Sequence, residues 1–170
     1  MKVDEAILTA LDYEKKVRDH YTQAAKDSED AQGKNFFKVL AREEQGHVDY
    51  LEQKLKEWQE QGKCLPDNIA TAIPNQEWIE KGVSRLKESG EKRDYQDDLK
   101  RLNTALLLEE EVSAFYKDLV GNVENPNADA MFRRFLEIED GHTAIVQAEI
   151  DVLTRTGYFY DVREFSVEAE

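Results

Sequence analysis

Six glutamate and histidine residues recur along the chain in an order that could bind metal ions. They are Glu14, Glu44, His47, Glu109, Glu139 and His142. Four of them form two Glu-x-x-His motifs, in which the carboxylate and the imidazole are three residues apart. Side chains at that spacing share one face of a helix, so each motif can direct both groups toward one point. Mixed oxygen and nitrogen ligands suit iron or manganese, whereas a purely soft site would need thiolates.

The charges of this set favour two divalent ions. The four carboxylates are negative and the two neutral imidazoles add no charge, so two divalent cations would neutralise the group. Without cations the glutamates would repel one another and take up protons. A single Glu-x-x-His motif in a Glu-rich chain would indicate only a solvated helix face, but two copies at matched positions indicate a dinuclear site. The alternative is a degenerate scaffold whose site is not filled.

The two halves of the chain align without a gap when the sequence is shifted by 95 residues. Most positions have diverged, yet the positions that still match are rich in Glu, His and Tyr. The matched pairs include Glu14 with Glu109, Tyr21 with Tyr116, Glu44 with Glu139, and His47 with His142. A repeat kept only for packing would match Leu to Leu more often. The pattern therefore favours a functional site built from two equivalent halves.

Four long helices can be predicted from apolar residues that recur three and four positions apart. The expected ranges are about 3–27, 31–61, 95–120 and 128–156. The six Glu and His residues lie in the middle of the apolar stripes rather than on the polar faces. A carboxylate on a buried face costs free energy unless something compensates its charge. Their place in the stripes therefore supports their interpretation as metal ligands.

Short polar turns join the first helix to the second and the third to the fourth, so each pair forms an antiparallel hairpin. Between the hairpins lies a crossover of about residues 62–94, with a short helix expected near 76–86. We therefore predict an all-α fold over residues 1–157, a ferritin-like four-helix bundle of two helical hairpins joined by a long crossover. The tail, 158–170, is aromatic and then acidic. It is expected to dock on the bundle or on a partner subunit through Tyr158, Phe159, Tyr160 and Phe165.

The order Ala-x-x-x-Glu-x-x-x-x-x-x-Tyr followed by Glu-x-x-His, repeated in both halves, resembles the rubrerythrin branch of the ferritin-like superfamily. The resemblance covers both hairpins, residues 4–156. It implies two iron ions bound by the six residues named above, with manganese or a mixed iron–manganese pair as alternatives. It also implies reduction of hydrogen peroxide or dioxygen at this centre. Glu44 and Glu109, or their repeat mates, would supply the carboxylates that bridge the ions.

Two departures from the rubrerythrin pattern limit what the resemblance implies. Rubrerythrin carries a rubredoxin domain with four cysteines, whereas this chain has one cysteine, Cys64, so an external donor such as a rubredoxin-like protein would supply electrons. Rubrerythrins also place an additional Glu one turn after the third-helix ligand, where this chain has Val112. The implied activity is that of an oxidoreductase of the peroxidase or ferroxidase type. A ferroxidase for iron handling, and a non-enzymatic metal-binding or partner-binding helical protein, are the alternatives.

Two tyrosines lie on the same stripes as the single glutamates. Tyr21 and Tyr116 are two turns beyond Glu14 and Glu109. One hypothesis is that each phenol hydrogen-bonds a ligand carboxylate from another helix and orients it. The other is that each is an aromatic core residue whose hydroxyl finds any available partner.

Three residues beside the ligands give further expectations. Gly46 and Gly141 interrupt the two Glu-x-x-His motifs, where Gly costs about 1 kcal/mol relative to Ala. Close packing between helices is the preferred explanation, and a functional helix bulge is the alternative. Glu43 is expected on the neighbouring face, where its replacement should leave stoichiometric iron loading intact.

The composition excludes two classes of partner. The formal net charge of −14, from 37 acidic and 23 basic residues, would repel nucleic acid and anionic membrane surfaces. No stretch approaches the ~20 uninterrupted apolar residues of a membrane span, and the N-terminal residues lack the apolar core of a signal peptide. We therefore expect a cytoplasmic protein. A homodimer is expected rather than a storage cage, because the long crossover and the bulky tail argue against a cage.

Overall fold

The structure is a computed structural model that describes residues 1–65, 67–85 and 94–165. The described part of the chain is all-α and contains no strand. Its elements are α1 (Val3–Asp27), α2 (Ala31–Gln61), α3 (Gln76–Arg85), α4 (Gln96–Leu119), α5 (Pro126–Thr156) and a 3-10 helix, η1 (Val162–Phe165). The ranges of α1 and α2 are those predicted from the apolar period, and α4 is shorter than predicted by one residue at each end.

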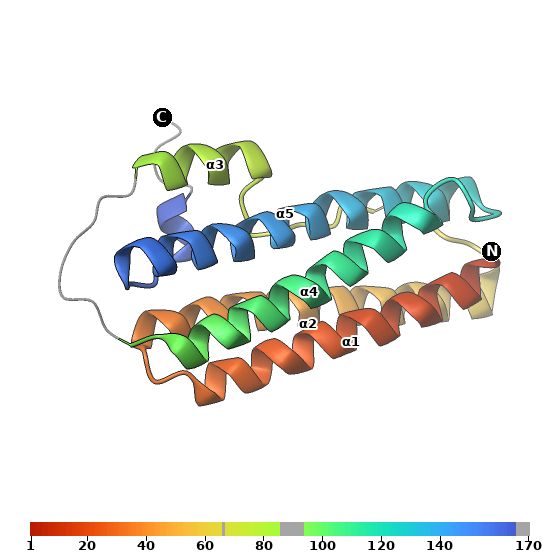
Figure 1. Cartoon of the computed structure of the whole chain (residues 1–170). Coiled ribbons are helices and arrows are strands. Elements are labelled where there is room, and N and C mark those ends of the chain that lie inside the picture. Colours follow the sequence, from red (N-terminus) through yellow and green to blue (C-terminus); the bar gives the residue numbers. More distant parts are fainter. Residues whose placement is uncertain (66, 86–93, 166–170) are drawn as a thin grey trace.

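The four long helices form a bundle of two antiparallel hairpins, α1 with α2 and α4 with α5 (Figure 1). The crossover between the hairpins returns along the bundle, so α2 and α4 run in the same direction. α3 lies on the outer side of α5. The N-terminus lies at the end of the bundle where α5 begins, and its ammonium group donates a hydrogen bond of 2.6 Å to the Asn122 carbonyl oxygen.

Capping residues fix the ends of the two helices that carry the Glu-x-x-His motifs. The Asp30 carboxylate accepts hydrogen bonds from backbone N–H groups in the first turn of α2, and the Asn125 side chain does the same for α5. Pro126 is the first residue of α5, two residues before the predicted start at 128. An Asn-Pro pair is equally typical of a turn and of a helix cap, which explains the error. Gly62 and Gly157 end the two helices with φ angles of 62° and 77°.

Two cationic side chains hold the start of the crossover against the bundle. The Lys54 ammonium group is buried and donates hydrogen bonds to the Leu65 carbonyl oxygen at 3.2 Å and to the Asp67 carboxylate. The Arg134 guanidinium, on α5, donates to the Ile69 carbonyl oxygen at 3.3 Å. These contacts place the crossover over α2 and α5, which are the two helices with Glu-x-x-His motifs.

The segment after α5 contributes to the core. Phe159 is 6% exposed, and its ring lies against Phe36 and Phe37 of α2 and against Tyr95. Tyr158 and Tyr160 are half-buried. The side chain of Phe165 and residues 166–170 lie outside the described residues, as does the end of the predicted short helix at residue 86.

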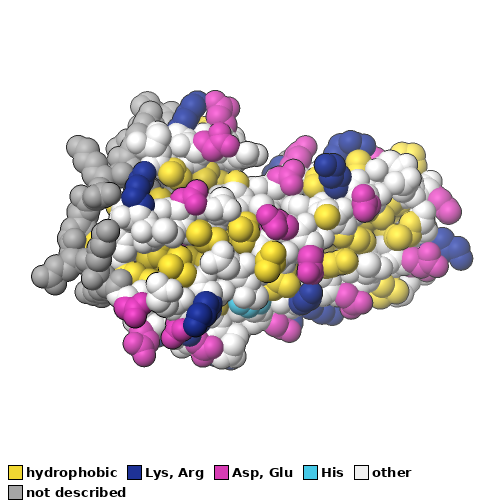
Figure 2. Space-filling model, in the orientation of Figure 1, with side chains coloured by type: hydrophobic (Ala, Val, Ile, Leu, Met, Phe, Trp, Pro, Cys, Tyr) yellow, Lys and Arg dark blue, Asp and Glu magenta, His cyan; other side chains and the backbone are white. Residues whose placement is uncertain are grey.

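The surface carries charges of both signs. On the face that Figure 2 shows, acidic and basic side chains are interspersed between apolar ones. Among the described residues, no helix combines the length and the apolar character needed to cross a membrane.

Candidate metal centre

The six predicted ligand residues meet at the middle of the bundle. Glu14 lies on α1, Glu109 on α4, and each of α2 and α5 contributes one Glu-x-x-His motif. Each of the six side chains belongs to a residue that is no more than 2% exposed. Apolar residues at helical spacing bury these faces of the helices, and the polar residues between them are buried as a consequence. The structure therefore brings together the whole predicted set.

One group of ligands surrounds the His47 imidazole. Its Nδ1 atom lies 3.1 Å from Glu14 Oε2, 3.2 Å from Glu44 Oε2 and 3.2 Å from Glu139 Oε1. These four residues can each offer one ligand atom such that all four atoms lie within 4.8 Å of one another. An ion with ligands at about 2.2 Å holds opposite ligands about 4.4 Å apart, so only small shifts would be needed to bind it.

A second group surrounds the His142 imidazole and overlaps with the first. Its Nδ1 atom lies 2.7 Å from Glu44 Oε1, 3.6 Å from Glu139 Oε2 and 3.9 Å from Glu109 Oε1. One ligand atom from each of these four residues, His142, Glu44, Glu139 and Glu109, can again lie within 4.8 Å of the other three. Glu44 and Glu139 belong to both groups, and each directs one oxygen toward each histidine. The shared pair is thus made of two repeat mates, Glu44 and Glu139, whereas the sequence left open which carboxylates of the set are shared.

The hydrogen bonding of the cluster is incomplete without cations. Eight buried nitrogen and oxygen atoms in it have no hydrogen-bond partner among the described residues. They include both carboxylate oxygens of Glu44 and of Glu139 and both ring nitrogens of His142. Glu44 Oε1 and His142 Nδ1 are 2.7 Å apart, yet neither atom has a hydrogen-bond partner among the described residues. Buried polar atoms are rarely left unpaired, so this donor set fits two divalent cations.

A comparison with protein families agrees with this geometry. A family model described as ferritin-like domain matches residues 4–151, which include all six residues of the cluster. The chain belongs to the ferritin-like domain family. The predicted all-α ferritin-like bundle is therefore confirmed. Comparisons with curated proteins and with solved structures found no significant match.

Two tyrosines connect the hairpins of the ferritin-like bundle at the cluster. Tyr21, on α1, donates a hydrogen bond to Glu109 Oε1 on α4, and Tyr116, on α4, donates one to Glu14 Oε1 on α1. Both tyrosines are fully buried. Each phenol therefore contacts a carboxylate of the other hairpin, in the arrangement that the first of the two sequence hypotheses describes.

Protonation of the cluster differs from that of free side chains. Burial and the charge of Glu139 raise the pKa of Glu44 to about 7. Burial lowers the pKa of the His47 and His142 imidazoles, but the surrounding carboxylates raise it by more, so both values lie well above 6.5. The cluster of this ferritin-like chain thus holds protons near neutral pH unless cations displace them.

Glu43 lies closer to the centre than the sequence indicates. Its side chain is 14% exposed, and its Oε2 atom is 3.8 Å from His142 Nε2. Burial raises the pKa of this carboxyl group, but hydrogen bonds from Thr71 and the Ala72 backbone and the nearby His142 lower it to about 2. Its position one residue before a ligand gave no signal, because the contacts come from the crossover and from α5. Val112, at the position where rubrerythrins carry an additional Glu, is buried.

The two motif glycines have different surroundings. A Cβ atom at Gly46 would meet nothing within 4 Å, so close helix packing is the wrong explanation for that residue. A Cβ atom at Gly141 would lie 3.6 Å from the Pro74 carbonyl oxygen, in ordinary contact with the crossover rather than with another bundle helix. Both residues lie within continuous α-helix, without a bulge.

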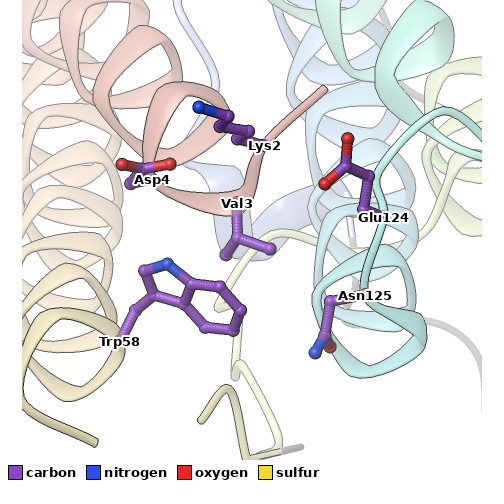
Figure 3. A pocket seen from close by; sticks show the side chains of 6 residues that line it. All are labelled: Lys2, Val3, Asp4, Trp58, Glu124 and Asn125. Carbon is purple, nitrogen blue, oxygen red and sulfur yellow. The ribbon is translucent and has the colours of Figure 1, made fainter. Parts of the chain in front are cut away.

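Two surface hollows lie away from the cluster. One, of about 400 Å³, lies near the N-terminus and is lined by Lys2, Val3, Asp4, Trp58, Glu124 and Asn125 (Figure 3). The other, of about 490 Å³, is mostly acidic and lies around the start of α4. Neither is lined by any of the six cluster residues.

Proposed function

We propose that this ferritin-like chain binds two iron ions and acts as a rubrerythrin-like oxidoreductase that reduces hydrogen peroxide or dioxygen. The observation that carries the proposal is the overlap of two buried ligand groups that share Glu44 and Glu139. A carboxylate with one oxygen directed at each histidine is suited to bridge two ions. Manganese, or one ion of each metal, would satisfy the same donor set.

Each residue of the cluster has a distinct part in this proposal. Glu14 and His47 would bind one ion, and Glu109 and His142 would bind the other, with the shared pair between them. The hydrogen bonds from Tyr116 and Tyr21 orient Glu14 and Glu109, so the terminal carboxylates are held before any ion arrives. Four carboxylates balance the charge of two divalent ions, which supports a dinuclear rather than a mononuclear site.

The burial of the cluster determines what the protein contributes to the reaction. When bound, two ferrous ions supply the two electrons that cleavage of one O–O bond requires. Reduction of one hydrogen peroxide to two waters would also consume two protons, which Glu44 cannot supply, because bound cations displace the proton that this residue holds in metal-free protein. The fully buried ligands exclude bulk water from this space, which disfavours side reactions there.

Electrons for further turnovers would come from an external donor, such as a rubredoxin-like protein. The chain has a single cysteine, Cys64, which is 2% exposed and lies 4.0 Å from the Met131 sulfur. One thiol cannot hold an iron–sulfur site, which usually needs four. We further propose that the protein is a homodimer, which light scattering would test.

Anaerobic titration with ferrous ion tests the proposal. We expect two ions per chain, followed by ferric absorption when hydrogen peroxide is added and repeated turnover when a reductant is present. Glu44→Ala and His47→Ala should each prevent stoichiometric loading. Glu110→Ala is the matched control, because Glu110 follows a ligand directly but is exposed.

The outcomes separate the alternatives. Failure of the parent chain to bind two ferrous ions would remove the enzymatic interpretation. Binding followed by oxidation and release of ferric iron, without repeated reduction of peroxide, would indicate a ferroxidase instead.

A further inference from the structure

Glu43 connects three parts of the molecule. It lies on α2, its Oε2 atom accepts a hydrogen bond of 2.6 Å from the Thr71 hydroxyl, and its Oε1 atom accepts one of 3.0 Å from the Ala72 backbone N–H. Thr71 and Ala72 belong to the crossover. The same Oε2 atom is 3.8 Å from Nε2 of His142, on α5. One carboxylate therefore links the crossover to a residue of the metal cluster.

The orientation of the His142 ring gives this contact a role. The Nδ1 atom of His142 faces the cluster carboxylates, while Nε2 faces Glu43. An imidazole that binds a metal through one nitrogen carries its proton on the other, and a carboxylate acceptor for that N–H fixes the ring and makes it a stronger ligand. Oxygen Oε2 has a second lone pair available beside the Thr71 hydrogen bond.

The other half of the repeat lacks this carboxylate. The position on α5 that corresponds to Glu43 is occupied by Ile138, which is 3% exposed and offers no acceptor. The Nε2 atoms of His47 and His142 are both buried without a hydrogen-bond partner among the described residues, so the difference between the halves is the carboxylate that lies 3.8 Å from His142 Nε2. A ring nitrogen of His47 lies within 4.8 Å of a Glu43 carboxylate oxygen, whereas Nε2 of His142 lies nearer, at 3.8 Å from Glu43 Oε2. The two halves of the cluster are thus inequivalent.

We propose that Glu43 is a positioning residue that accepts a hydrogen bond from Nε2–H of metal-bound His142, and that this makes the two metal positions unequal in affinity. The proposal rests on the two-metal function proposed above. The ion beside His142 binds more tightly than the ion beside His47. The crossover takes part in this difference, because Thr71 and Ala72 hold the Glu43 carboxylate in place.

Anaerobic titration with Co²⁺, followed by its visible absorption, tests the affinities. The parent chain should bind two ions in two distinguishable steps. Glu43→Gln should weaken the tighter step by about 10- to 100-fold and leave the weaker step unchanged. Thr71→Val should weaken the same step by a smaller factor. Asp140→Asn is the matched control, because this exposed carboxylate also adjoins a ligand, Glu139, and its loss changes the net charge equally.

A direct measurement identifies the histidine involved. In zinc-loaded protein labelled with nitrogen-15, the Nε2–H proton of His142 should exchange slowly with water, and Glu43→Gln should shift its resonance and speed its exchange. The corresponding His47 signal should not change. Unchanged His142 signals, or equal effects on both histidines, would overturn the proposal. So would a third ion per chain that Glu43→Gln removes, because Glu43 would then be a ligand itself. Absence of two-ion binding by the parent chain would instead refute the proposed function.

Discussion

Tyr21 and Tyr116 satisfy carboxylates that burial would otherwise leave unpaired. Each phenol donates to a glutamate of the opposite hairpin, and removal of the hydroxyl leaves that oxygen without this partner. We expect Tyr21→Phe and Tyr116→Phe each to lower the free energy of unfolding of metal-free protein by about 1–3 kcal/mol. Urea denaturation measures this change.

Tyr50→Phe is the control for these two substitutions. The Tyr50 hydroxyl is buried but has no hydrogen-bond partner among the described residues. Its ring contacts with Phe135 and Lys54 would remain in phenylalanine. Its replacement should therefore change the unfolding free energy little. If all three variants lose equal stability, the phenol–carboxylate bonds contribute no more than general packing.

The pKa values of the cluster predict how the folding stability of metal-free protein depends on pH. The pKa of Glu44 is about 7 in the folded chain against 4.5 for the ordinary group, and the pKa values of His47 and His142 are raised above 6.5. The folded state therefore binds more protons than the unfolded state as pH rises from about 5 to 8, so its stability falls over that range.

Metal binding should show the opposite dependence on pH. An ion must displace the protons held by Glu44 and the two histidines, so its affinity rises with pH. Protons released on addition of zinc, measured with an indicator dye in weak buffer at pH 6.5, should exceed one per chain. A titration that releases no protons would contradict the predicted protonation of the cluster.

At the level of the helices, glycine substitutions in α2 should have opposite effects. Gly46 is exposed in the middle of the helix and a Cβ atom there meets nothing, so Gly46→Ala should add about 0.5–1 kcal/mol of stability. A Cβ atom at Gly33 would lie 2.7 Å from Cε2 of the Phe159 ring and 2.8 Å from the Ser28 hydroxyl oxygen. Gly33→Ala should therefore cost about 1–3 kcal/mol. Thermal unfolding of the two variants checks both signs, and two changes of the same sign would show that the described contacts of Phe159 do not hold in solution.

The helices and their ligand-bearing faces could be predicted from sequence because their signals are local. Apolar spacing fixes which face of a helix is buried, and the 95-residue repeat shows which polar residues on that face matter. The shared pair Glu44 and Glu139 could not be predicted, because sharing depends on the distance between α2 and α5 across the bundle. The sequence also did not indicate that Glu43 lies beside His142. Its hydrogen-bond partners, Thr71 and Ala72, belong to the crossover, which has no periodic pattern from which their position could be predicted.

For the molecule as a whole, the cluster places four carboxylates and two histidines in the core of a chain that already has a net charge of −14. Folding brings these carboxylates together, and burial and then repulsion from Glu139 raise the pKa of Glu44. Buried charges with incomplete hydrogen bonding usually reduce stability compared with apolar side chains of similar volume. The site should therefore lower the stability of metal-free protein, and bound cations should restore it.

Removal of the shared pair tests this trade-off between stability and metal binding. Both oxygens of Glu44 and of Glu139 lack hydrogen-bond partners within the described part of the chain, so Glu44→Leu with Glu139→Leu should stabilise metal-free protein by about 1–4 kcal/mol. Zinc at about 100 times its dissociation constant should stabilise the parent by about 2.7 kcal/mol per site and leave the double variant unchanged. Urea denaturation with and without zinc measures both effects.

The terminal pair provides the contrast to this result. Glu14→Leu with Glu109→Leu removes the acceptors of Tyr116 and Tyr21, and each buried hydroxyl left unpaired costs about 1–3 kcal/mol. This second double variant should therefore gain less stability than the first, or lose some, although both remove two charges. If the two double variants were equally stable, charge alone would govern the core and the phenol hydrogen bonds would have no influence. A lower stability of the first variant would instead mean that the histidines already compensate Glu44 and Glu139 without metal.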